Sequence, residues 1–268
     1  MTRVVVVGGG VVGACCAYSL AKAGCRVTVL DRAAFGSGCS HANCGYVCPS
    51  HVLPLAAPGA VRQTLATLCR PNSPFRIRPG VVLRDPGWFL RFARRCNRRD
   101  MVAAGDAIRG LLASSRTLYD ELLKAERIQC EWETRGLLFV FRTAAAFAHY
   151  ADTDRLLTDR FATPARRLAG DELTAFEPGL KPGLAGGYWY EGDAHLRPVL
   201  VGLGVDGRDH TPVTEIVREG GRAKAVRTPA GDVDADHVVL AAGAWSPHLA
   251  AGLGCRVMVQ PGKGYSLT

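Results

Sequence analysis

Residues 4–13 read VVVVGGGVVG, and this stretch decides the fold. Four consecutive valines are typical of a strand that is buried on both faces of a parallel sheet. Gly8, Gly10 and Gly13 then fill a G-x-G-x-x-G pattern where a strand gives way to a helix. In such a turn the first glycine permits the tight bend, and the second lets a diphosphate approach the backbone. The third lets the helix pack closely against the strand.

The residues that follow complete a strand-helix-strand unit. The helix is predicted to end just before Gly24, where a C-terminal cap belongs. Residues 26–30, RVTVL, form a second strand, and Asp31 stands at its end, 18 residues after Gly13. An acid there can accept hydrogen bonds from an adenosine ribose, while the positive end of the helix faces the diphosphate. The order predicts dinucleotide binding; the alternative is a glycine-rich turn that serves packing only.

A second literal match to the glycine pattern lies at residues 202–207, GLGVDG. Residues 208–212, RDHTP, cannot begin an amphipathic helix, and no strand ending in an acid follows them. We interpret this second match as a coincidence.

The chain has 268 residues, of which 48% are hydrophobic. This composition is typical of a globular protein with one large domain or two modest ones. No apolar run approaches the roughly 20 residues of a membrane-spanning helix, and the N-terminus lacks the features of a secretion signal. We expect a cytoplasmic protein whose ten cysteines are mostly free thiols. The net charge of +9 favours an anionic cofactor, carboxylate substrates or a lipid surface, and we expect no nucleic-acid partner.

Residues 39–51, CSHANCGYVCPSH, place three cysteines and two histidines close together. No C-x-x-C pair occurs and the spacing differs from that of plant ferredoxins, so we predict no metal site. The alternative is a loop after the second strand in which Ser40, Asn43 and the backbone amides around Gly45 contact a cofactor.

The middle of the chain combines helices and strands. Residues 88–99, WFLRFARRCNRR, predict a basic amphipathic helix that can lie on anionic lipid, the alternative being a solvated helix face. Residues 107–124 carry leucines at helical spacing, which predicts a helix packed in the core. After Trp132 a second domain is predicted. It comprises strands near 136–141 and 187–190 and helices near 144–157 and 171–176.

The last part of the chain returns to short strands. Residues 214–217, 224–228 and 232–235 predict a β-meander, with glycines between the strands. Residues 236–246, DHVVLAAGAWS, predict another buried strand that ends in a glycine turn, where backbone can come close to a ligand.

Several of these segments together resemble the superfamily of D-amino-acid oxidases and dehydrogenases. They are the glycine turn, SHANCGYV at 40–47, EGDAHLRP at 191–198, LAAGAWS at 240–246 and QPGKGYSLT at 260–268. GLLFVFRT at 136–143 and the closing KGYSLT look most like the bacterial D-amino-acid dehydrogenases. The resemblance covers nearly the whole chain.

The resemblance implies an α/β fold with two parts. An FAD-binding Rossmann-like domain, a parallel sheet with a β-meander, would comprise residues 1–128 and 193–256. A mixed α+β substrate domain would comprise residues 129–192 and 257–268 and is expected to be incomplete, because relatives continue beyond the motif in which residue 268 falls. Relatives also have a helix of several turns after the proline that matches Pro198. In this chain only twelve residues, 199–210, separate Pro198 from Thr211, so that helix is expected to be nearly absent.

The resemblance also implies a set of site residues. The glycine turn would hold the FAD diphosphate, Asp31 and Arg32 would lie at the ribose, and Val213 would touch the adenine. Five residues of the 40–45 segment, all except Cys44, would line the isoalloxazine ring. The complete cofactor set is Val7, Gly8, Gly9, Gly10, Val11, Val12, Gly13, Asp31, Arg32, Ser40, His41, Ala42, Asn43, Gly45, Val213, Ala242 and Gly243. Lys263 and Tyr265 are candidates for the active-site side, and the alternative for Tyr265 is a packed strand residue.

The implied reaction is hydride transfer from the Cα of a D-amino acid to flavin N5, followed by hydrolysis of the imino acid. Electrons would pass to a quinone or another respiratory acceptor, with residues 88–99 touching the inner face of the plasma membrane. The protein then supplies orientation and electrostatics. Two alternatives stay open: a non-catalytic, truncated nucleotide-binding remnant, and an NAD(P)H-dependent flavin reductase. The absence of a second usable glycine loop counts against the reductase.

Overall fold

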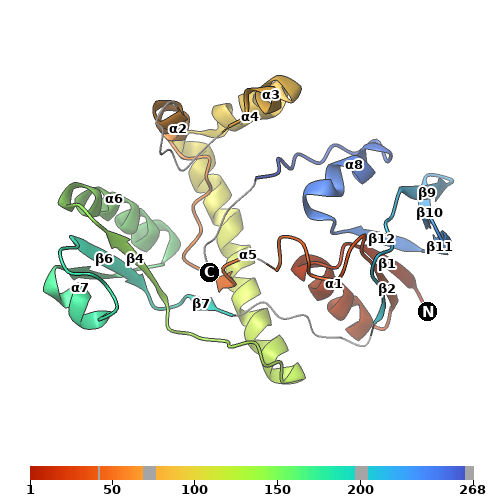
Figure 1. Ribbon diagram of the computed structural model, residues 1–268, viewed down its shortest axis with the longest axis horizontal. Helices are drawn as coiled ribbons and strands as arrows, with labels where there is room; N and C mark the ends of the chain where they lie inside the picture. Colours follow the sequence, from red (N-terminus) through yellow and green to blue (C-terminus); the bar gives the residue numbers. More distant parts are fainter. Residues whose placement is uncertain (42, 69–76, 197–204, 263–268) are drawn as a thin grey trace. The chain divides into compact units, whose positions relative to one another are not determined.

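The computed structural model describes residues 1–41, 43–68, 77–196 and 205–262 (Figure 1). The fold consists of two compact units. Unit 1 comprises Met1–Asn43 and Pro198–Thr268, and unit 2 comprises Cys44–Arg197. The predicted domain boundaries at 128/129 and 192/193 concern which segments serve FAD and which serve substrate, and they stay a prediction.

Unit 1 is built on a four-stranded sheet in the order β12-β1-β2-β8. Its strands are β1 (Arg3–Val7), β2 (Arg26–Leu30), β8 (Asp206–Arg208) and β12 (His237–Leu240). All three neighbouring pairs run parallel. Helix α1 (Val11–Lys22) connects β1 to β2, and Gly24 follows it with φ +84°, as predicted for its cap.

Both faces of this sheet are covered, which explains the run of valines. Val5 and Val7 pack on one face against the meander, in a cluster with Ile216 and Val226. Val6 packs on the other face with Ala17 of α1. The prediction that β1 is buried on both faces is confirmed, since all four valines are at most 5% exposed.

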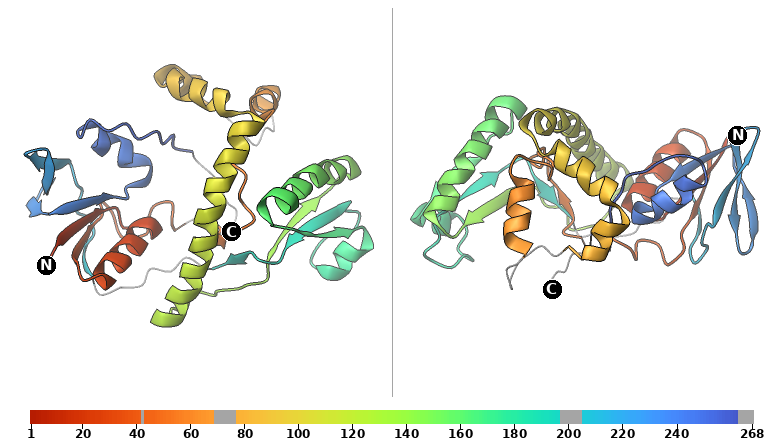
Figure 2. Two further views of the ribbon diagram at one scale, coloured as in Figure 1. Left: turned by 180° about the vertical axis from the view of Figure 1, so that it is seen from behind. Right: turned by 90° about the horizontal axis from the view of Figure 1, so that it is seen from above.

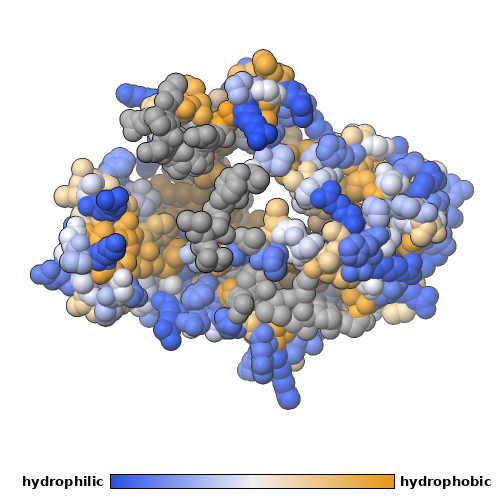
Figure 3. Space-filling view, viewed as in Figure 1, coloured by the Kyte–Doolittle hydropathy of each residue, from blue (hydrophilic) through white to orange (hydrophobic). Residues whose placement is uncertain are grey.

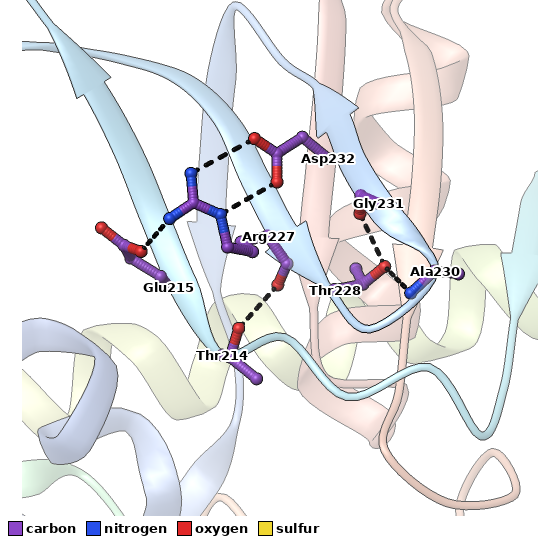
Figure 4. Close-up of polar contacts among 7 residues, drawn as sticks. All are labelled: Thr214, Glu215, Arg227, Thr228, Ala230, Gly231 and Asp232. Carbon is purple, nitrogen blue, oxygen red and sulfur yellow. Dashed lines mark hydrogen bonds and ion pairs between the residues drawn. The ribbon is translucent and has the colours of Figure 1, made fainter.

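The meander is a three-stranded antiparallel sheet in the order β11-β10-β9. Its strands are β9 (Glu215–Glu219), β10 (Arg222–Thr228) and β11 (Gly231–Asp234). Arg227 on β10 donates to Glu215 at 2.6 Å and to Asp232 at 3.1 Å, linking the three strands on their polar face (Figure 4). After β12 the chain forms a short 3-10 helix, η1 (Gly243–Trp245), and α8 (Ser246–Ala251).

Unit 2 contains a three-stranded antiparallel sheet, a two-stranded ribbon and six helices among its described residues (Figure 2). The sheet has the order β4-β6-β5, with β4 (Leu137–Phe141), β5 (Arg166–Ala169) and β6 (Gly186–Tyr190); β3 (Tyr46–Val47) pairs with β7 (Ala194–His195). The helices are α2 (Ala60–Leu68), α3 (Pro79–Arg84), α4 (Pro86–Arg95), α5 (Arg98–Glu126), α6 (Ala144–Phe161) and α7 (Asp171–Phe176). Helix α6 packs on the sheet through Phe147, Leu157 and Phe161, which form a core with Tyr188 and Tyr190.

The prediction of one helix over residues 88–99 is wrong. Helix α4 ends at Arg95, and the last two arginines of the stretch begin α5. Asn97 separates the helices because its backbone is extended (φ −137°, ψ 160°) and its side chain accepts the Asp100 N–H at 3.0 Å. This N-cap starts a new helix and ends the previous one.

The prediction that the leucines of 107–124 pack in the core is also wrong in part. The helix exists and is longer than predicted, but Leu111 is 73% and Leu118 is 61% exposed. The buried positions of α5 are Met101 and Gly105, near its N-terminal end.

The second glycine match does not form a strand-turn-helix unit in its described part. Gly207 lies inside β8 and pairs with Val29 of β2, while residues 202–204 lie outside the described part of the chain. At Gly207, the structure therefore supports the interpretation that this second match is not a nucleotide-binding loop.

Candidate functional site

The carboxyl ends of β12, β1 and β2 meet at one edge of the unit 1 sheet. β1 lies between a strand that follows it directly and a strand from the far end of the chain. In open α/β sheets, ligands bind at the carboxyl edge where neighbouring connections leave in opposite directions. Gly8, Asp31 and Ala241 follow these three strands, and they begin the candidate site.

Two glycines of the turn are required by the protein's own packing. Gly8 has φ +113°, and a Cβ placed there would lie 2.4 Å from the carbonyl oxygen of Ala241. A Cβ on Gly13 would lie 1.8 Å from the carbonyl oxygen of Gly8. Any larger residue at either position collides with backbone, so packing alone explains both glycines.

Gly10 is different. Its backbone (φ −77°, ψ −179°) is open to any residue, and among the described residues a Cβ there would meet the Ser40 hydroxyl alone, in a tight contact of 3.1 Å. Packing therefore restricts this position much less than it restricts Gly8 and Gly13, whereas a diphosphate that approaches the backbone requires a glycine here. The alternative explanation of the glycine pattern was that the turn serves packing alone. That explanation accounts for Gly8 and Gly13 but does not account for Gly10.

Gly10 is also the N-cap of α1, and the helix begins without a side-chain cap on that residue and without an acid in its first turn. N–H groups in the first turn of a helix have no intrahelical acceptor, and the helix dipole adds positive potential there. Ser40 Oγ accepts the Val11 N–H at 2.9 Å. Val11 and Val12 are 42% and 63% exposed, so this turn is accessible to an anionic group.

Asp31 fixes the turn and keeps capacity for a ligand. Its Oδ2 accepts the Gly9 N–H at 2.7 Å and its Oδ1 accepts the Ala33 N–H at 2.9 Å. A carboxylate has about four lone-pair sites, so two remain for ribose hydroxyls. The Thr211 N–H bonds to the Asp31 carbonyl at 2.6 Å, which anchors the segment that leads to Val213.

Arg32 lies over the ring of Trp245, with its guanidinium carbon 3.6 Å from the ring centroid. The contact joins the residue after Asp31 to η1, which follows β12. Trp245 is 44% exposed. Sequence reasoning assigned Arg32 and missed Trp245, although that tryptophan stands in the LAAGAWS motif.

The remaining predicted cofactor residues of unit 1 lie around this edge. The Ala241 N–H bonds to the carbonyl of Val7 at 2.8 Å, the Ala242 carbonyl accepts the Trp245 N–H at 3.1 Å, and Gly243 has φ +54°. Val213 is partly buried and packs on the core cluster beneath the sheet.

The predicted isoalloxazine loop divides between the two units. In unit 1, His41 is exposed, and the Asn43 side-chain amide donates to the carbonyl of Ser40 at 3.0 Å, so the loop closes on itself. Gly45 has φ +63° and belongs to unit 2, where its carbonyl accepts the Leu196 N–H at 3.0 Å. Ala42, Lys263 and Tyr265 lie outside the described residues, and their predicted roles are untested.

Unit 2 holds a buried polar cluster that sequence reasoning missed. Asp193, 1% exposed, accepts hydrogen bonds from the Ser50 N–H at 3.0 Å and from the Ser50 hydroxyl. Burial, followed by the charge of Asp193, raises the pKa of the nearby Cys48 thiol to about 12. The hydroxyls of Tyr150 and Tyr190 lie 3.1 Å apart, and burial is the main cause that raises the pKa of Tyr190.

Across the described residues, His, Cys, Asp and Glu form no group of three or more that could bind a metal ion. Nine cysteines of the same part of the chain are free thiols. None of the helices in the described ranges is both long and apolar enough to cross a membrane.

Comparisons with known proteins agree with this geometry. Residues 3–268 match the family model described as FAD dependent oxidoreductase. The D-amino acid dehydrogenases of Paramagnetospirillum magneticum and Cereibacter sphaeroides are 35% and 34% identical over 99% of this chain. The chain spans 66% and 64% of their respective lengths. Among solved structures, glycine oxidase from Bacillus cereus has a similar fold, with a TM-score of 0.63 and 19% identity over 94% of this chain and 58% of that one.

Proposed function

The chain belongs to the family of FAD-dependent oxidoreductases, and from this premise we propose that unit 1 binds FAD and that the whole protein oxidises D-amino acids. The observation that carries the proposal is Gly10, where a Cβ would meet no described backbone, so that a ligand explains the glycine better than packing does. The D-amino acid dehydrogenases at 33–35% identity support the substrate class.

In this proposal each group at the sheet edge has a task. The N–H groups at the start of α1 hold the diphosphate, and Asp31 accepts hydrogen bonds from the ribose while its other contacts keep Gly9 in place. Arg32 and Trp245 form one side of the adenosine site, and Val213 the other. Bound FAD would accept a hydride from the substrate Cα at N5, and water would convert the imino acid to a keto acid and ammonia.

The test begins with the visible spectrum of the purified chain titrated with FAD. D-alanine is then added without oxygen, and L-alanine serves as the matched control. Bleaching by D-alanine alone supports the dehydrogenase. Bleaching by NADPH alone supports a flavin reductase. FAD uptake without bleaching by any of the three supports the non-catalytic remnant.

Gly10→Val tests the site within the same chain. A Cβ at this position meets no described backbone within 4 Å, so we expect a smaller loss of melting temperature than for a substitution at Gly13, together with the loss of FAD binding. Gly38→Ala is the control, because that glycine lies in the loop after β2, two residues before Ser40, and has open space around it. If the Gly10→Val chain retains FAD with unchanged affinity, the diphosphate does not lie on this turn.

We further propose that electrons leave for a quinone or another respiratory acceptor, and that α2, α3 and α4 contact the inner face of the plasma membrane. Leu65, Leu83 and Leu90 on these helices are 63%, 81% and 53% exposed. Leu65 also lines an apolar groove of about 490 Å³ between α2 and the end of α4, together with Arg62 and Ala93. Figure 3 shows apolar side chains among hydrophilic ones over α3 and α4, at the top of the view.

Apolar side chains beside arginines are the composition that binds anionic lipid surfaces. The protein should therefore co-sediment with vesicles of anionic lipid on centrifugation, and it should not co-sediment with vesicles of zwitterionic lipid. The double variant Leu83→Glu/Leu90→Glu should stay in the supernatant, whereas Leu111→Glu/Leu118→Glu, which adds the same two charges at positions of α5 that are 73% and 61% exposed, should behave like the wild type. Equal sedimentation of both variants contradicts the assignment of this face.

A further inference from the structure

The aromatic ring of Phe35 lies between two glycines that are far apart in the sequence. A Cβ on Gly9 would lie 2.1 Å from Cδ1 and 2.7 Å from Cε1 of the ring. A Cβ on Gly207 would lie 3.0 Å from Cε2 and 3.3 Å from Cζ, which is another edge of the same ring. Each glycine leaves the space that one edge of the ring occupies.

Gly9 is held by the same short segment on its polar groups as well. Its N–H donates to the Asp31 carboxylate at 2.7 Å, and its carbonyl accepts the Gly36 N–H at 3.1 Å. The turn from Asp31 to Gly36 therefore contacts Gly9 through a carboxylate, a ring and a backbone amide. Gly9 immediately precedes Gly10, so a shift of Gly9 moves the start of α1.

The ring accounts for Gly207, the last glycine of the second match, without a nucleotide. It lies in β8 opposite Val29 of β2, and the ring covers it from one face of the sheet. On that face Phe35 and Val205 pack against the cluster that contains Val6 and Ala17. The ring thus connects the cofactor turn to an edge strand through apolar contact.

We propose that Phe35 is the positioning residue of the cofactor turn, and that Gly9 and Gly207 are glycines because they receive its ring. The proposal rests on the proposed function only for the statement that the turn binds FAD. Phe35 touches neither the diphosphate nor the substrate in this account. It acts by fixing Gly9, and through Gly9 the N–H groups that face the cofactor.

The test is a double-mutant cycle between Gly9 and Phe35, in which the measured quantity is the affinity for FAD. Gly9→Ala pushes against the ring and should weaken FAD binding about tenfold or more, and Phe35→Ala should weaken it because the turn loses its support. The double variant Gly9→Ala/Phe35→Ala should bind FAD more tightly than Gly9→Ala alone, since the new methyl group then has room. Wild-type affinity in Gly9→Ala, or no recovery in the double variant, overturns the proposal.

Gly207→Ala extends the cycle to a residue on the edge strand. Its Cβ meets the ring less severely, at 3.0 Å, so FAD affinity should fall only a few-fold and recover in Gly207→Ala/Phe35→Leu. Gly38→Ala is again the control and should leave affinity unchanged.

Melting temperatures of the FAD-free variants separate the two proposals. If the wild-type chain takes up no FAD, the proposed function fails, and the packing of Phe35 is still tested by whether the double variants recover the melting temperature lost in Gly9→Ala and Gly207→Ala. If melting temperatures recover but FAD affinities do not, the ring is structural only and the positioning role is overturned.

Discussion

Asp31 in unit 1 and Asp193 in unit 2 both hold a neighbouring loop with a carboxylate, but in different surroundings. Asp193 is 1% exposed, and its carboxylate accepts hydrogen bonds from the Ser50 N–H and hydroxyl and lies beside the Cys48 thiol. Asp31 is half-buried and accepts two backbone N–H groups at the edge of the sheet. The comparison teaches that a buried carboxylate with protein partners stabilises the fold, whereas one beside an accessible helix start can also serve a ligand.

The largest expected effect concerns Cys48, which lies beside Asp193. A thiol whose pKa is raised from 9.0 to about 12 has about a thousandfold less thiolate at neutral pH. Iodoacetamide should therefore alkylate exposed Cys39 and Cys44 first and leave Cys48 unmodified in the native chain. Peptide mass spectrometry over time measures the order. Alkylation of Cys48 as fast as Cys44 would mean that this side of the cluster is open to water.

The substitution Asp193→Ala should have the next largest effect, a loss of folding stability. It leaves the buried Ser50 N–H and hydroxyl without their acceptor, which lowers the free energy of unfolding by about 3 kcal/mol. Ser50→Ala is the matched control and should cost about 1 kcal/mol, because the N–H bond survives. Urea unfolding followed by tryptophan fluorescence measures both. Equal costs for the two variants would show that the Ser50 N–H finds another acceptor.

Asp31→Ala should lower the free energy of unfolding less than Asp193→Ala does, but it should also weaken FAD binding. Water can replace part of the lost acceptor at a half-buried position, so we expect a stability loss of about 1 kcal/mol. FAD affinity should fall about tenfold or more, because both the ribose contact and the support of Gly9 are lost. FAD titration and urea unfolding of the same preparation separate the two effects. A variant with lower stability and unchanged affinity would place Asp31 with Asp193 as a structural carboxylate.

Asp236 extends the comparison to an exposed carboxylate. Hydrogen bonds from the Arg3 side chain and then from its backbone N–H lower the pKa of Asp236 from 3.8 to about 2. Because the folded pKa lies below the unfolded one, the stabilisation is present above about pH 4 and is lost as the pH falls through about 2. The effect should be the smallest of the four, since exposed pairs are screened by solvent.

Melting curves between pH 2 and pH 6 test this carboxylate. The advantage of the wild type over Asp236→Asn should be present at pH 6 and disappear toward pH 2. Asp232→Asn, which removes a different exposed partner of an arginine, is the control for a general effect of charge. An advantage that persists at pH 2 contradicts the role of the Arg3 contact.

The features that the sequence predicted well are those encoded by neighbours along the chain. The valines of β1, the glycines of the turn and Asp31 lie within thirty residues of one another, and each restricts the others. The start of α5 was missed although it is encoded locally: Asn97 followed by Asp100 is an N-terminal capping pattern, but Asn97 lies between two pairs of arginines that favoured a single basic helix.

The features that the sequence did not predict depend on contacts between distant residues. Ser50 and Asp193 are 143 residues apart, and neither has a local pattern that announces the pair. The ring of Phe35 meets Gly207 across an even longer separation, so Gly207 looked like part of a nucleotide motif until its neighbour was known. Trp245 was visible within a motif, but its stacking partner Arg32 was not.

The pairing of β1 with β12 has a consequence for how the protein is made. Arg3 and Asp236, which are joined at the start of these strands, are 233 residues apart. At about 5–20 residues per second, a ribosome needs roughly 10–50 s to synthesise the second strand after the first has emerged. During that interval the valines of β1 have no partner on one side, so the nascent chain depends on α1, β2 or a chaperone to shield them.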